Sequence, residues 1–460
     1  MRTRLSYAWE QLRASYWFIP MAMVSAAIIL SAASVSVDRT IDHAWVPPLA
    51  GTYPGGPAEA STLLSTIAGS MITVAGLTFS ITIVTLSLAS SQFGPRLLRS
   101  FMRDTGTQVV LGAFVAIFVY SILVLHAIDS TDSPAFVPRI SVTITLLIAV
   151  AGLGVLIYFI HHVSSSIQAG NVIASVGQDL DEAIDALSPD RAGTACPATL
   201  PSGDAPAPSQ VDRPGHPIPA AQTGYLQAID DDALMNLAST RDLVLRLLYR
   251  PGDFVVEESD LVIVWPGDAV DEEVINRIDE AFLIGAARLR LQDVEFAVDQ
   301  LVEIAVRALS TGINDPFTAI ACIDRLGASL AHLAERDIPP AHRYDEHGSL
   351  RLVHDALTFA GIVDAAFNQI RQNGRSSAPI AMRLLESIAI IAARARTGEQ
   401  RDALRRQADM IWSGCAEVLP MEEDRNDLER RYRLVLAALG KHRSVPSATL
   451  ADSLPRPSTP

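Results

Sequence analysis

The chain has 460 residues, 49% of them hydrophobic, with 36 basic and 51 acidic side chains and a net charge of −15. Residues 1–162 contain eight Arg, no Lys and seven acids, a net charge of +1, so the remainder holds 28 basic and 44 acidic residues and a net charge of −16. This division predicts a membrane part joined to an acidic soluble part, which argues against nucleic-acid binding, and three scattered Cys indicate neither a disulfide framework nor a thiolate zinc site.

Four apolar segments predict membrane-spanning helices, the first of them uncleaved: Trp17–Val37, Ser61–Ser91, Thr107–Ile128 and Ile140–Ile160. Six arginines lie on one predicted side, before the first span and after the second, whereas the opposite loops offer only Arg39 and Arg139. The positive-inside rule then predicts an inner-membrane protein with both termini in the cytoplasm.

The second span has an unusual composition. Ser61–Ser91 is 31 residues long, carries no charge and contains thirteen Ser or Thr. Small residues recur along it in steps of four and three, broken only by Ile83, and such a spacing places them in one stripe of a helix. In a membrane, the stripe either packs closely against another helix or lines water. Its members are Thr62, Thr66, Gly69, Thr73, Gly76, Ser80 and Ser87.

The rest of the chain predicts a cytoplasmic region of several parts. Helical periodicity continues past the fourth span and predicts that one long helix extends into a stalk, 163–188. A linker rich in proline follows at 189–221, and a small β-module at 222–266 has strands at 223–230, 242–249, 253–256 and 261–265 and a short helix near 231–238.

A helical domain is expected over 267–443, before a disordered tail at 444–460. Its predicted helices are 272–309, 316–335, 350–372, 380–396, 399–418 and 424–439. The fold class is therefore a mainly α membrane protein with four spans, a stalk, a β-module and a cytoplasmic helical domain.

Several motifs resemble a family of predicted bacterial membrane proteins known as domain of unknown function 2254. They are Ser90–Leu98 with Phe101–Asp104, Arg250–Asp253, and Ala308–Ser310 with Gly312–Pro316. The resemblance covers nearly the whole chain apart from the linker and the tail. It departs at Thr311, where relatives often have Pro, and it implies no established activity.

Residues 224–264 also look weakly like half of a biotinyl/lipoyl-type β-barrel, through Gly252-Asp253, Val255 and Leu261. Glu258 replaces the second glycine of that fold, and no lysine is available to carry a swinging cofactor. We therefore expect a β-module for packing or assembly, and no cofactor.

Two groups of cytoplasmic residues have both a structural and a functional interpretation. In the 312–316 motif, Gly312 suits a left-handed position, Asp315 a helix cap and Pro316 a first turn, and Asn314 and Asp315 could also contact a ligand, an ion or a neighbouring subunit. Likewise, Arg288, Arg290, Gln292, Asp293 and Glu295 can form ion pairs along a helix or serve an interface.

The cytoplasmic end of the second span has the same double interpretation. Gln92 and Phe93 precede Arg96, Arg99 and Arg103, which share a helix face and either fix topology at the headgroups or, in a ring of subunits, form a positive collar at a pore mouth.

The spans after the first contain no acidic or basic residue except His126 near an end, which argues against ion-coupled transport. The sequence also lacks GxxxxGK[ST], HExxH and GxSxG, and His354-Asp355 is a pair without metal-ligand spacing. We expect no enzyme and no metal site.

Two functions remain open from the sequence. One is an oligomeric pore lined by the second span and assembled or gated by the cytoplasmic domain; its partners are lipid, further copies of the chain and a small ion. The alternative is a non-conducting scaffold or sensor, whose stripe packs helices while the cytoplasmic domain binds a partner. The sequence specifies neither the ion, the gating stimulus, the subunit number nor the partner protein.

Overall fold

The computed structural model describes residues 16–40, 53–94, 104–128, 136–166, 168–187, 215–288, 292–355 and 357–440. The chain divides into two compact units, residues 1–172 and 173–460. Within the described ranges, five helices are long and apolar enough to cross a membrane, judged by length and composition; four of them lie in the first unit.

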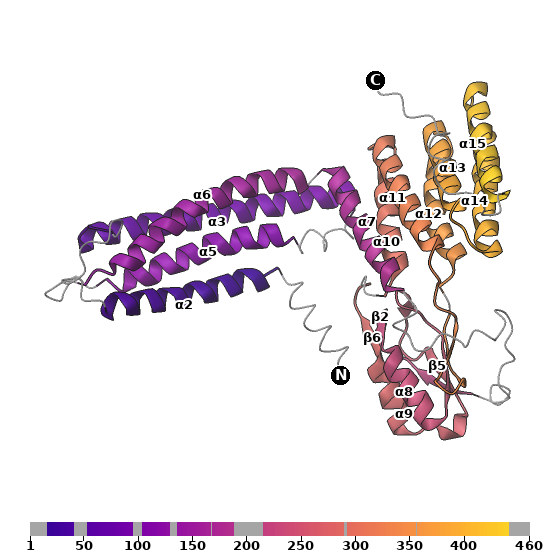
Figure 1. Ribbon diagram of the computed structural model, residues 1–460, viewed down its shortest axis with the longest axis horizontal. Coiled ribbons are helices and arrows are strands. Elements are labelled where there is room, and N and C mark those ends of the chain that lie inside the picture. The colour runs from indigo at the N-terminus through magenta and orange to yellow at the C-terminus, as the bar shows by residue number, and fades with distance from the viewer. Residues whose placement is uncertain are drawn as a thin grey trace. The chain divides into compact units, whose positions relative to one another are not determined.

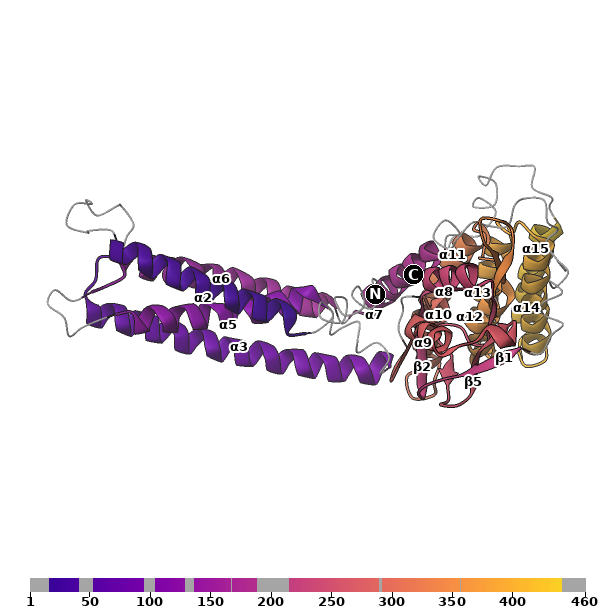
Figure 2. The ribbon, with the colours of Figure 1, turned by 90° about the horizontal axis from the view of Figure 1, so that it is seen from below.

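The first unit is a bundle of four long helices, α2 (Phe18–Thr40), α3 (Pro57–Phe93), α5 (Thr105–His126) and α6 (Arg139–Ser166) (Figures 1 and 2). Helix α5 packs against each of the other three, and α3 packs against α5 and α6. Met71 and Ala75 of α3 meet Phe114 and Ile117 of α5 in this core. The outer faces carry exposed apolar side chains, as expected of helices surrounded by lipid.

At one end of this bundle, a polar contact joins α5 to α6. Asp104 caps α5 by accepting hydrogen bonds from the backbone N–H groups of Gly106 and Thr107, each at 3.2 Å. The same carboxylate lies 2.7 Å from Nε2 of His162 on α6. A Cβ at Gly106 would meet the His162 ring at 2.5 Å, so the close approach of α5 and α6 depends on glycine there.

The prediction of one continuous helix from the fourth span into the stalk is wrong. Helix α6 ends at Ser166, and α7 (Ala169–Ala186) is a separate helix. Polar side chains explain the break, because Asn171 Nδ2 donates to the Ser165 carbonyl at 2.7 Å, and such side chains compete with helical hydrogen bonds.

The second unit contains two small sheets. The first has the order β1-β5-β3-β8-β7, formed by β1 (His216–Pro219), β3 (Val244–Leu247), β5 (Asp260–Trp265), β7 (His342–Tyr344) and β8 (Leu350–Val353). The second has the order β4-β2-β6, formed by β2 (Gly224–Ile229), β4 (Phe254–Val255) and β6 (Phe282–Gly285). All neighbouring strands are antiparallel except β3 and β8. Helices α8 (Asp231–Arg241) and α9 (Glu272–Ala281) contribute Leu234 and Ile278 to the core, and a short 3-10 helix lies at Gly267–Ala269.

The four strands and the short helix predicted in 222–266 are confirmed, but the sheets recruit distant segments. Predicted helix 272–309 is wrong over 282–285, because Phe282–Gly285 pairs with β2, and predicted helix 350–372 is wrong at its start, which forms β8. The predicted linker is likewise wrong at 216–219, where Ile218 is buried in β1, whereas 188–214 lie outside the described residues. The strands of 224–264 divide between two sheets, so the half-barrel likeness is not confirmed.

The remaining helices form three stacked hairpins in two layers (Figure 1). One layer contains α10 (Val294–Ala308), α12 (Phe359–Gly374) and α14 (Gly398–Ala416), and the other contains α11 (Pro316–Ala334), α13 (Ala378–Ala392) and α15 (Glu422–Gly440). Helix α11 is the fifth apolar helix. In its most apolar stretch of 18 residues, 56% of the residues are buried within the protein, a larger share than in any of the other four helices. The predicted tail 444–460 lies outside the described residues.

Helix α7 is bound to α11 through side chains. Asp181 of α7 accepts a hydrogen bond from Ser329 at 2.6 Å and pairs with Arg325. One turn further, Asp185 pairs with His332 at 2.9 Å and with Arg336 at 2.5 Å. These contacts fix α7 to the helix that begins with the Asn314–Pro316 motif.

Candidate functional site

The seven stripe residues of α3 all lie on its free surface. Each is exposed in the folded chain, and a Cβ added at Gly69 or Gly76 would meet nothing within 4 Å. The opposite side of α3 is its packing face, with Ala68, Met71 and Ala75 buried. Since successive residues turn by about 100°, Ala75 points about 200° away from Thr73. The stripe is therefore not packed against the chain's own α5 or α6.

The three threonine hydroxyl groups of the stripe bond to their own helix. Thr62, Thr66 and Thr73 donate to the carbonyls four residues earlier, at 2.7–2.8 Å. These bonds remove most of the penalty of an unsatisfied hydroxyl in an apolar medium. The exposed stripe is therefore a surface of small side chains, and its threonine hydroxyl groups already have hydrogen-bond acceptors within α3.

The cytoplasmic-mouth residues are only partly described. Gln92 is exposed at the end of α3, whereas Phe93 is buried, which makes Phe93 a packing residue within the folded chain. Arg96, Arg99 and Arg103 lie outside the described residues, so their placement as a collar stays a prediction.

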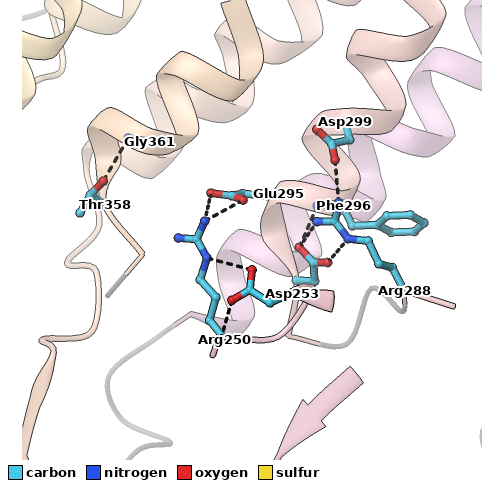
Figure 3. Close-up of polar contacts among 9 residues, drawn as sticks. Arg250, Asp253, Arg288, Glu295, Phe296, Asp299, Thr358 and Gly361 are labelled. Carbon is cyan, nitrogen blue, oxygen red and sulfur yellow. Dashed lines mark hydrogen bonds and ion pairs between the residues drawn. The ribbon is translucent and has the colours of Figure 1, made fainter. Parts of the chain in front are cut away.

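A network of arginines and carboxylates joins the β-sheets to α10 (Figure 3). Arg250, in the turn between β3 and β4, contacts both carboxylate oxygens of Glu295 at 3.1 Å. Arg288, after β6, binds both oxygens of Asp293 at 2.8 and 2.9 Å and also Asp299 at 2.8 Å. The Asp293 side chain is only 2% exposed. Ion pairs therefore form, but they join the segments after β3 and β6 to α10 and do not run along one helix. Arg290 lies outside the described residues.

The carboxylates of this network are partly removed from water. Burial raises the pKa of Asp293 and of Glu295, and the guanidinium groups of Arg288 and Arg250 oppose that rise. Asp293 is also the N-cap of α10, because it accepts the Phe296 N–H at 2.9 Å. Removing one arginine would leave a buried carboxylate without its counter-charge.

The Arg250–Asp253 motif forms the turn that brings Arg250 to this network. Gly252 has φ +102°, and a Cβ there would lie 2.4 Å from an Asp293 oxygen. Asp253 accepts the Arg250 N–H at 2.9 Å and closes the turn. Glycine is thus required both by the backbone and by the approach of Asp293.

The 312–316 motif is a helix start, as the capping interpretation predicted. Asp315 accepts hydrogen bonds from the Thr318 hydroxyl at 2.6 Å and from the N–H groups of Phe317 and Thr318 at 3.1 Å. These bonds, led by the Thr318 hydroxyl, lower the pKa of Asp315. Pro316 is the first residue of α11. The prediction for Gly312 is wrong, because Asn314 takes the left-handed conformation at φ 51°, which asparagine tolerates.

Sequence reasoning missed the polar groups buried inside the membrane bundle. Asp38 is 1% exposed, and Tyr120 is also 1% exposed. Tyr120 lies 2.9 Å from the Ser34 hydroxyl, and Asp38 binds Ser141 of α6. The sequence did offer one signal, Asp38 near the end of an apolar span, because a carboxylate in a membrane needs hydrogen-bond partners.

The bundle of long apolar helices agrees with the family that the chain matches. The family described as "Predicted membrane protein (DUF2254)" matches residues 13–389. The chain belongs to this family. Uncharacterised proteins of Mycobacterium bovis and of two Mycobacterium tuberculosis strains are each 30% identical over 429 residues, covering 90% of this chain and 79% of each relative. No solved structure matches the chain.

Proposed function

We propose that this member of the family is an oligomeric, non-enzymatic pore of the bacterial inner membrane, with four spans, both termini in the cytoplasm and α3 facing the axis. The observation that carries the proposal is the exposure of all seven stripe residues on the side of α3 opposite its packing face. One chain with four spans is too small to surround a wide channel alone, so such a channel needs several copies around an axis.

Neighbouring surfaces of α3 favour this assignment of faces. Leu77 is next to Gly76 of the stripe and is 56% exposed, as suits lipid, whereas Ile83 interrupts the stripe and is 51% exposed. The stripe itself presents two glycines without neighbours and a row of hydroxyls. Small polar surfaces meet protein or water in known membrane proteins, and a ring of α3 helices would offer both.

A non-conducting scaffold is the second candidate. The back-bonded hydroxyls at Thr62, Thr66 and Thr73 favour it, because these groups need no water. Gly69 and Gly76 would then admit a second α3 at short distance without leaving a pore. In this second candidate, a scaffold or sensor, the stripe packs helices and the cytoplasmic domain binds a partner, so conduction separates it from the pore.

Conductance of the full chain in planar bilayers tests the proposal. Thr73→Leu should reduce the current by narrowing or dewetting the pore, because Thr73 is exposed in the middle of the stripe. Arg96→Glu should shift the reversal potential toward cation selectivity, because it inverts one charge of the proposed collar.

The opposite result is equally clear. A purified oligomer that carries no current at any voltage or salt concentration would refute the pore and support the scaffold. A monomer at all protein concentrations would also refute the pore.

A further inference from the structure

The last helical hairpin has an aromatic groove on its surface. Trp412 of α14 and Tyr432 of α15 are stacked, with ring centroids 5.6 Å apart and planes inclined by 14°. They border a hollow of about 530 Å³ between the two helices. The groove is also lined by Asp402, Arg405, Arg406, Asp409, Met410 and Ser413.

The charged groups beside the groove are mostly engaged with one another. Arg406 contacts both carboxylate oxygens of Asp364 at 2.7 and 2.8 Å. Asp409 accepts the Tyr432 hydroxyl at 2.6 Å and lies 3.9 Å from Arg405. Among the residues that line the groove, Asp402 and Asp409 balance Arg405 and Arg406, so its carboxylates and guanidinium groups are equal in number.

Residues 441–460 have the composition that such a groove accepts. They contain four prolines, and Lys441, Arg443 and Arg456 outweigh Asp452, a net charge of +2 in an otherwise acidic region. Segments rich in proline dock on aromatic grooves with little entropic loss, and basic residues among them pair with carboxylates at the rim.

The geometry of α15 places this segment within reach. The described chain ends at Gly440, eight residues beyond Tyr432, or about 12 Å along the helix. Four extended residues span about 13 Å, so a chain turning back after Gly440 reaches the rings before its first proline, Pro446.

We propose that residues 441–460 bind in the groove of their own α14–α15 hairpin, with prolines against Trp412 and Tyr432 and basic side chains toward Asp402 and Asp409. The segment would cover the outer surface of the last hairpin in the stack, where no further hairpin follows within the described residues. This inference is independent of whether the protein conducts.

Photo-crosslinking of the full chain tests the proposal. A benzoylphenylalanine placed at Ser413, inside the groove, should form adducts with peptides from 441–460, identified by mass spectrometry. The same group at Asn373, an exposed residue of α12 outside the groove, is the control. Trp412→Ala should lower the adduct yield roughly tenfold, as loss of an aromatic anchor does.

A second variant avoids any effect on folding. Pro455→Ala with Pro457→Ala changes only the segment and should also lower the yield. Mixing chains of light and heavy isotope content separates binding within one chain from binding to another copy. Adducts mainly with another copy, with lipid or with a different protein, the absence of any adduct at Ser413, or a yield that neither variant changes would overturn the proposal.

Discussion

Asp38 of α2 and Ser141 of α6, 103 residues apart, form a helix cap supplied from another helix. One oxygen of Asp38 accepts both the backbone N–H of Ser141, at 2.9 Å, and its hydroxyl, at 2.7 Å. The other oxygen accepts the Ile140 N–H at 2.9 Å. The carboxylate thus satisfies donors at the first turn of α6, where an apolar span offers no acceptor of its own.

Asp38→Ala should destabilise the membrane bundle, because it leaves these buried donors without an acceptor. We expect a loss of about 2–3 kcal/mol. The melting temperature in detergent measures it. Asp38→Asn retains one acceptor oxygen and should lose less, so equal losses in the two variants would contradict the capping role.

Gly252→Ala should disrupt the joint between the sheets and α10. The new Cβ would occupy a strained backbone conformation and displace Asp293 from Arg288, at a cost of about 2–4 kcal/mol in the free energy of unfolding. Gly398→Ala at the start of α14 is the control, since a Cβ there meets nothing within 4 Å. Similar stability of both variants would show that the close approach of Asp293 is unimportant.

His354 should make stability depend on pH. Burial lowers the pKa of its imidazole to about 4, with a smaller opposing effect from Asp231. The unfolded chain, with a pKa of about 6.5, binds the proton more tightly, so stability is fully present above pH 6.5 and falls as the pH drops from 6.5 toward 4. The loss should reach about 3 kcal/mol.

Unfolding at pH 7.5 and 4.5 measures this effect. His354→Gln should reduce the difference in stability between the two pH values. An unchanged difference would assign the acid sensitivity to other groups.

The predicted topology, with both termini in the cytoplasm, rests on the arginine distribution and can be tested by labelling. In a chain whose Cys196, Cys322 and Cys415 are replaced, an impermeant thiol reagent should label Thr52→Cys in intact cells and Gly203→Cys only after lysis. Labelling of Gly203→Cys in intact cells would reverse the orientation.

Local patterns in the sequence determined much of this architecture. The apolar runs specify helices that are long and hydrophobic enough to cross a bilayer, because both properties are local to the segment. The stripe from Thr62 to Ser87 follows from helical periodicity, and the cap at Asp315 follows from residue types adjacent in sequence. These features depend on neighbours within a few residues.

Only the tertiary structure decided the features that join distant segments. Phe282–Gly285 forms a strand because β2 offers a partner edge, although the residues before it are helical. The pairs Arg250–Glu295 and Asp38–Ser141 join residues 45 and 103 positions apart, and no local pattern specifies such partners. The face of α3 that remains free was also undecided in the sequence, because it depends on where α5 and α6 pack.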